Sequence, residues 1–182
     1  MSAETFTTAM FLITAVIAAA VLINAVFPIV YNMAETFSSS SHAADVRLRT
    51  DFTIVNTFAF SGNNPQTIQV WMKNIGTEPI SLAEINQSDV YAGVSGNVGL
   101  LQLGGVGTPY TNNGITQSST PASGYWQAYL SDLNNNKLWD PGETLQVTAV
   151  LPSTNSLSSG TQVYFQYVLP NGIARSIQFN AS

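Results

Sequence analysis

The stretch TFTTAMFLITAVIAAAVLINAVFPIVYNMA, from Thr5 to Ala34, decides the architecture of this chain because it contains no charged side chain. A helix crosses the hydrocarbon of a bilayer with roughly 20 consecutive apolar residues, and this run is longer. A cleaved signal peptide would have a basic start and a short apolar segment, yet no Lys or Arg precedes Arg47. We predict an uncleaved hydrophobic helix that either anchors the chain in a membrane or packs in the core of a filament. A buried helix of a soluble protein is the less favoured alternative.

The rest of the composition excludes several classes of protein. Charged residues make up 8% of the chain, against roughly 25% in ordinary soluble proteins. The chain has no cysteine, so it has no disulfide framework and no thiolate chemistry. Its 5 basic residues do not cluster, and the net charge is -5, so we expect no nucleic-acid partner.

Two regions follow from the change in sequence pattern along the chain. Residues 1–47 are expected to form the hydrophobic helix and a stalk, which is either a polar helix or a flexible linker with a joint at Ser38–Ser41. From position 48 to 182, apolar and polar residues alternate with a period of two, and Gly, Pro and Asn separate the runs. Seven or more short strands with such turns predict an all-β antiparallel sandwich of immunoglobulin-like type. Within it, 93–124 is expected to be an irregular loop with one short strand, at 98–103.

A resemblance to a known family rests on three parts of this sequence. They are FLITAVIAAAVLINAVFPIVYNMAETFSSSSHAADVRLRTDF (11–52), the VLINA turn within it (21–25), and KNIGTEPI (73–80). Together they resemble the archaellum (archaeal flagellum) accessory protein G family, which belongs with archaellins and type IV pilin-like proteins. The chain shows no basic leader of the archaellin kind, which favours an accessory protein over a filament subunit.

The resemblance implies an archaellin-like sandwich outside the cell and a helix in the cytoplasmic membrane. It also implies self-assembly into a homo-oligomer, binding to the archaellum accessory protein F, and attachment of the rotary motor to surface-layer proteins. One alternative is an archaellin or pilin-like subunit in an extracellular filament, with its helix in the filament core. Another is a membrane-anchored adhesion or sugar-binding module.

The segment DLNNNKLWDPGE, from Asp132 to Glu143, concentrates oxygen-bearing side chains in a chain that otherwise has few charges. Its spacing matches a twelve-residue calcium loop except at position 6, where Lys137 replaces the usual glycine. The flanking segments read as strands, so we expect a structural calcium ion in a loop between strands. The predicted oxygen ligands come from Asp132, Asn134, Asn136, the carbonyl of Leu138, Asp140 and Glu143. The alternative is an ordinary polar hairpin loop.

Other patterns are weaker. Asn86 begins an Asn-Gln-Ser triplet and is the better candidate for N-glycosylation if the domain lies outside the membrane. A catalytic triad would need His42, the single histidine, which the pattern places in the stalk. The clustered carboxylates are better explained by a metal ion than by acid-base chemistry, so we expect no enzyme.

Overall fold

The computed structural model describes residues 2–60, 66–104 and 120–182. It divides the chain into two compact units, Met1–Asp45 and Val46–Ser182.

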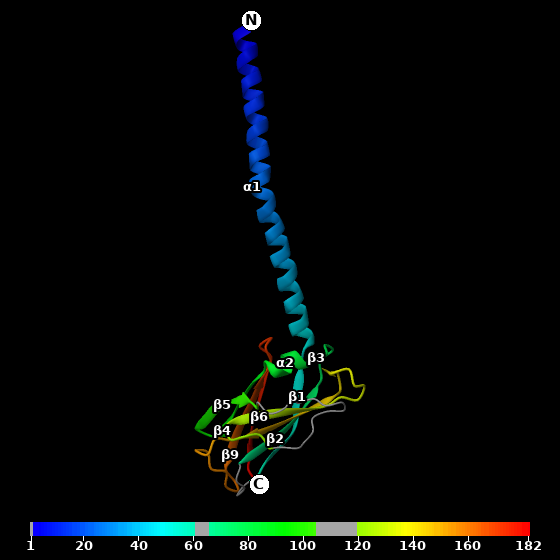
Figure 1. Cartoon of the computed structure of the whole chain (residues 1–182), viewed down its shortest axis with the longest axis vertical. Coiled ribbons are helices and arrows are strands. Elements are labelled where there is room, and N and C mark those ends of the chain that lie inside the picture. Colours follow the sequence, from blue (N-terminus) through cyan, green and yellow to red (C-terminus); the bar gives the residue numbers. More distant parts are fainter. Residues whose placement is uncertain (1, 61–65, 105–119) are drawn as a thin grey trace. The chain divides into compact units, whose positions relative to one another are not determined.

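The first element is α1, Ser2–Arg49, a continuous helix of 48 residues that contains Pro28 (Figure 1). A proline ring fits the helical φ but has no N–H, so the carbonyl of Asn24 loses its donor four residues later. The serines Ser38–Ser41 are also helical, which decides between the two alternatives for the stalk in favour of a helix. The serines disfavour a helix only weakly, and the alanines and long side chains around them favour one.

The second unit begins with the last residues of α1 and continues with strands and one short helix. Their bounds are β1 Phe52–Ala59, β2 Thr67–Asn74, β3 Ile80–Ser81, α2 Leu82–Asn86, β4 Asp89–Val94, β5 Asn97–Leu103, β6 Tyr125–Ser131, β7 Leu138–Trp139, β8 Thr144–Val150, β9 Gln162–Val168 and β10 Ala174–Asn180.

Eight strands follow one another in the order β1-β2-β8-β6-β5-β4-β9-β10, and β3 pairs separately with β7. All neighbours in the large sheet are antiparallel except β5 and β6, which are parallel over Gln102↔Tyr125 and Leu103↔Trp126. The sheet folds over, so that β1, β2, β8 and β6 face the other four strands across a common core (Figure 1). The predicted hydrophobic helix followed by a mostly antiparallel β-sandwich is confirmed.

Large side chains from both layers meet in this core. The Phe52 ring lies edge-on to Tyr167 at a centroid distance of 5.6 Å, and Trp126 lies 6.1 Å from the same tyrosine. Each of these three side chains is at most 1% exposed. In β2 the even positions Ile68 to Asn74 are buried and the odd ones are not, which is the period of two that the sequence predicted.

The structure also contains elements that the sequence pattern did not reveal. β3 and β7 have two residues each, and α2 has five, too few for any period to be seen. α2 begins with a capping box, in which Ser81 and Glu84 bond to each other's backbone N–H. The strand expected at 98–103 is present as β5, whereas 105–119, in the middle of the predicted irregular loop, lies outside the described residues.

Candidate functional site

The first candidate surface is the apolar section of α1, defined here as Ala9–Tyr31. Its large apolar side chains are all exposed, from 45% at Val26 to 72% at Phe11. In the part of the chain that the structure describes, one helix is long and apolar enough to cross a membrane, and it is α1. A helix that is apolar all round has to be buried in a protein core or in lipid. This unit contains no such core of its own, so its apolar surface has to be covered by something else.

The second candidate surface is one end of the sandwich, named here the charged end. In sequence, no charged side chain occurs within 52–72, 90–131, 144–174 or 176–182. From Asp51 onward, the charged residues therefore fall at strand ends, in the short helix α2 and in the loops.

The strand registers place these residues at the same end of the sandwich. Lys73 is paired with Thr53 near the start of β1 and with Thr144 at the start of β8. Asp89 opens β4 opposite Val168, the last residue of β9. Among the described residues of the sandwich, the flanks and the opposite end lack charged side chains as a result.

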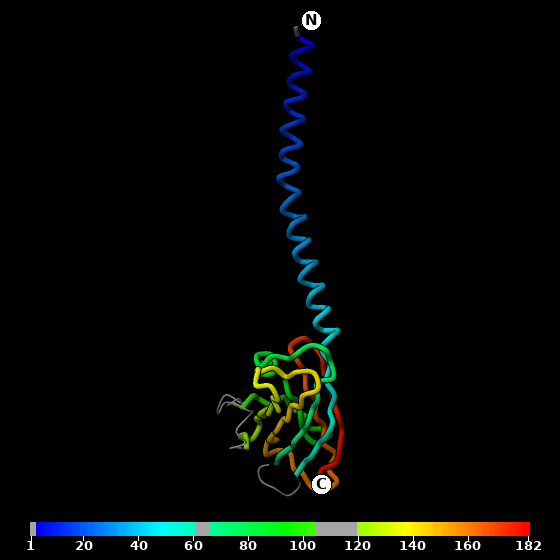
Figure 2. The backbone as a smooth tube through the Cα atoms, turned by 90° about the vertical axis from the view of Figure 1, so that its right-hand side faces the viewer, coloured from blue at the N-terminus to red at the C-terminus, as the bar shows by residue number. Residues whose placement is uncertain are grey.

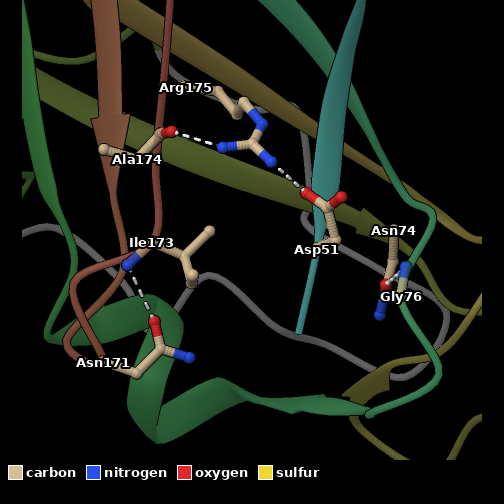
Figure 3. A network of polar contacts seen from close by, with 7 residues as sticks. All are labelled: Asp51, Asn74, Gly76, Asn171, Ile173, Ala174 and Arg175. Atoms are coloured by element: carbon tan, nitrogen blue, oxygen red, sulfur yellow. Dashed lines mark hydrogen bonds and ion pairs between the residues drawn. The ribbon is translucent and has the colours of Figure 1, made fainter. Parts of the chain in front are cut away.

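A polar network ties the charged end together (Figure 3). The Arg175 guanidinium donates hydrogen bonds to the Asp51 carboxylate and to the Ala174 carbonyl, and it lies 6.0 Å from the centroid of the Phe52 ring. These contacts join the start of β1 to the start of β10. Both side chains of the ion pair are 40% or more exposed, so water screens much of their attraction.

The turn between β2 and β3 closes on the end of α1. The Arg49 carbonyl accepts hydrogen bonds from the backbone N–H of Thr77 at 2.9 Å and of Glu78 at 3.2 Å. Helix ends leave carbonyls without intrahelical donors, and this turn supplies donors to one of them, the carbonyl of Arg49. Gly76 permits the approach, because a Cβ there would lie 2.4 Å from the Arg49 carbonyl oxygen.

Asn74, the last residue of β2, forms hydrogen bonds with the same turn. It is fully buried, and its amide nitrogen donates to the carbonyls of Glu78 at 3.0 Å and Trp139 at 2.8 Å. Its amide oxygen accepts from the N–H of Gly76 at 2.9 Å (Figure 3). These three hydrogen bonds attach the turn to β2 and to β7.

The predicted calcium loop lies between β6 and β8 and includes β7, as expected for a loop between strands. The Asp132 carboxylate accepts backbone hydrogen bonds from Asn134, Asn136 and Lys137, the last at 2.8 Å. The Glu143 carboxylate accepts from the N–H of Leu133 at 2.8 Å and of Asp140 at 3.1 Å. Lys137 has φ 63, the left-handed conformation for which calcium loops use glycine at this position.

The Asp140 carboxylate lies opposite two amides of this loop. Its Oδ2 atom accepts a hydrogen bond of 2.7 Å from Asn134 Nδ2 and another of 2.7 Å from Asn136 Nδ2. Across 2–60, 66–104 and 120–182, no three acidic or histidine side chains form a group that could hold a metal ion. An ion in this loop would therefore need amide and backbone oxygens as well as carboxylates, and both amides would have to turn their oxygens toward it. Calcium binding stays a prediction.

The candidate glycosylation site lies at the end of α2. Asn86 is exposed, but Ser88 of the same triplet is only 6% exposed, and its hydroxyl donates to the Glu84 carbonyl at 2.7 Å. Glycosylation of Asn86 also stays a prediction.

The third candidate surface is formed by the terminal strands of the sheet order, β1 and β10. The two strands run side by side (Figure 2), joined by Arg175 and Asp51 at one end and by the Ser182 N–H bonded to the Ala59 carbonyl at the other. Between these ends the register of β1 is broken by a bulge at Val55, which is 53% exposed. Edge strands are commonly protected by charge, and neither strand offers any apart from Arg175.

Comparison with known proteins places the chain in a family. The model of the archaeal-type flagellin family matches residues 2–179. The chain belongs to the archaeal-type flagellin family. The match covers both the helix and the sandwich, and it confirms the resemblance to archaellins drawn from the N-terminal sequence.

Individual proteins in the comparison are distant. An uncharacterized protein of Archaeoglobus fulgidus is 22% identical over 99% of both chains. A chain of the archaeal flagellum of Methanospirillum hungatei strain JF1 is 15% identical, with a TM-score of 0.52 over 93% of this chain and 91% of that one. The archaellum periplasmic stator protein FlaG of Sulfolobus acidocaldarius is 22% identical, with a TM-score of 0.48 over 71% of this chain and 99% of that one. At these identities the flagellum likeness shows a shared fold, and the role within the family has to be argued from this chain.

Proposed function

We propose that the chain is a non-enzymatic structural component of the archaellum machinery, held in the cell membrane by α1 with its sandwich outside the cytoplasm. The observation that carries the proposal is the apolar section Ala9–Tyr31, whose side chains are exposed on every face. At 1.5 Å per residue it is about 35 Å long, close to the roughly 30 Å hydrocarbon thickness of a bilayer. The more polar part of α1, from Asn32 to Arg49, follows directly.

In this role the sandwich assembles with other copies and links the motor to the cell envelope. The uncharged flanks and the strands β1 and β10, which carry no charge apart from Arg175, suit packing against neutral surfaces, because few like charges would repel there. The resemblance to the accessory protein G family supports accessory protein F and surface-layer proteins as further partners.

A second candidate function is that of a filament subunit. It is favoured by the likeness to the flagellum chain of Methanospirillum hungatei, which extends over 93% of this chain and so includes much of α1. In that case neighbouring helices, instead of lipid, would cover the apolar section.

Cell fractionation separates the two candidates. For the membrane anchor, the full chain should sediment with membranes, resist extraction by high salt, and dissolve in mild detergent. Residues 46–182 alone should be soluble. Recovery of the full chain in sheared filaments that survive detergent would favour the filament subunit, and a soluble monomeric full chain would contradict both.

Light scattering on residues 46–182 tests assembly through the sheet edge. Val55→Lys places a charge in the middle of β1 and should shift the protein from oligomer to monomer, because a buried unpaired charge is costly. Ile75→Lys is the matched control, since Ile75 is 55% exposed and Val55 53%, but Ile75 lies in the turn after β2. A wild-type domain that stays monomeric at high concentration, or equal effects of both substitutions, would count against edge assembly.

A further inference from the structure

Asn24 is a polar residue within the apolar section of α1. Its side chain is exposed, and no hydrogen bond of that side chain occurs among residues 2–60, 66–104 and 120–182. Thr14, in the same section, satisfies its hydroxyl within the helix by donating to the Met10 carbonyl at 2.8 Å. The Asn24 amide makes no such hydrogen bond to the described residues.

The backbone at Asn24 adds an unused acceptor. Pro28 lies four residues further along α1 and has no N–H to donate to the Asn24 carbonyl. An amide with two donors and one acceptor therefore lies beside a backbone carbonyl that has lost its helical partner. No other position of the apolar section combines the two features in sequence.

In the hydrocarbon of a membrane, no water is available to hydrogen-bond the Asn24 amide and carbonyl. Asn24 lies seven residues before Tyr31, the end of the apolar section, which is about 10 Å along the helix. An asparagine side chain is too short to reach the interface from there, unlike the long side chains that do so. Unpaired polar groups are costly in hydrocarbon, and another helix is the available source of partners.

A second copy of α1 supplies that partner at the right depth. Copies inserted by the same route run parallel, so their Asn24 residues meet at the same level, and an amide is complementary to another amide. Ala20 lies one turn earlier on the same face and allows the two backbones to come close. Charged residues are absent from this face, because the run from Thr5 to Ala34 contains none.

We infer that α1 pairs with a second copy of itself in the membrane through hydrogen bonds of the Asn24 amide to the Asn24 amide and carbonyl of its neighbour. The inference rests on the proposed membrane placement of α1. It identifies one face of the helix as the contact and a second copy of this chain as the occupant, in preference to lipid or a different protein.

Disulfide trapping of the full chain in phosphatidylcholine vesicles tests the inference. The chain has no cysteine, so Ala20→Cys introduces a unique thiol on the face of Asn24. Ala19→Cys is the matched control, because residue 19 lies about 140° around the helix from residue 24. Disulfide formation requires Cα atoms within about 7 Å, so we expect Ala20→Cys to form dimers and Ala19→Cys to form few.

Removing the amide should weaken the pair. In the Ala20→Cys background, Asn24→Leu should reduce association roughly threefold to thirtyfold, the range seen for hydrogen bonds between membrane helices. Asn24→Gln should keep most of it. Asn32→Leu, the same substitution just beyond the apolar section, should change little.

Three results would overturn the inference while leaving the membrane placement of α1 intact. The first is equal trapping at positions 19 and 20, and the second is trapping at position 20 that Asn24→Leu leaves unchanged. The third is cross-linking in native membranes to a different protein only. A full chain that does not associate with vesicles at all would overturn the membrane placement itself, and with it this inference.

Discussion

The apolar section of α1 and the core of the sandwich use the same kinds of side chain in opposite ways. Phe11 in the helix is 72% exposed, whereas Phe52 in β1 is fully buried against Tyr167 and Trp139. The sandwich finds the partners for its apolar residues within its own unit. The helix does not, so its stability depends on whatever surrounds it. The sandwich sequence therefore specifies a packed fold, whereas the helix sequence requires an apolar environment.

The largest expected effect comes from making the same substitution in both regions. Phe52→Ala should destabilise the sandwich by about 3–5 kcal/mol, because it removes a large buried side chain and leaves a cavity. Phe11→Ala should leave unfolding of the sandwich unchanged. Denaturant titration of the full chain in detergent checks this through tryptophan fluorescence, since all three tryptophans, Trp71, Trp126 and Trp139, lie in the sandwich.

Membrane association is the control for the two phenylalanine substitutions. Neither should change it, because many apolar side chains remain in the helix. Equal loss of sandwich stability in both variants would mean that α1 packs on the sandwich and that the two units do not fold independently.

A smaller effect is expected from calcium, which should act on the sandwich and not on the helix. Binding to the folded state alone stabilises by about 2.7 kcal/mol at a hundredfold excess over Kd, which raises the melting temperature by several degrees. Chelator should reverse the shift, magnesium should substitute poorly, and Glu143→Gln should remove most of it by weakening the closing ligand. Identical melting curves with calcium and with chelator would mean that this loop binds no calcium and is a polar turn stabilised by hydrogen bonds of its own amides.

The smallest effect on stability is expected from Lys137→Gly, which tests the calcium site more specifically. Lys137 has φ 63, and this conformation costs a residue with a Cβ about 1–2 kcal/mol. Glycine avoids that cost, although it loses roughly 0.5–1 kcal/mol through greater freedom in the unfolded chain. Stability without the ion should therefore change little, while calcium affinity rises because a repelling charge is gone. A fall in affinity would mean that the Lys137 side chain shapes the loop.

Much of this architecture could be predicted from sequence because its signals are local. A long run without charge predicts a helix in an apolar environment, and alternation in segments such as Thr67–Asn74 predicts strands with one buried face. The Asn171-Gly172 pair predicts the turn between β9 and β10, where Gly172 has φ 82. Each of these depends on residues within a few positions of one another.

The candidate surfaces were harder to predict because they depend on contacts between distant residues. The Arg175–Asp51 pair joins residues 124 positions apart, and the Asn74–Trp139 hydrogen bond spans 65. No local pattern predicts that Lys73, Asp89 and Arg175 share one end of the sandwich. Likewise, the exposed bulge at Val55 becomes visible only in the register of β1 against β2.

The sequence by itself determined that this chain has one charge-free helix, a β domain with few charges, and an Asp/Asn-rich loop with calcium-like spacing. Hydrophobic periodicity and charge are properties of neighbouring residues, so they can be read without coordinates. Only the tertiary structure decided the strand order, the gathering of charge at one end, and the position of β1 beside β10. Those features depend on which strands pair. Pairing depends on packing of the whole core around Phe52, Trp126 and Tyr167, and no short segment of the sequence contains that core.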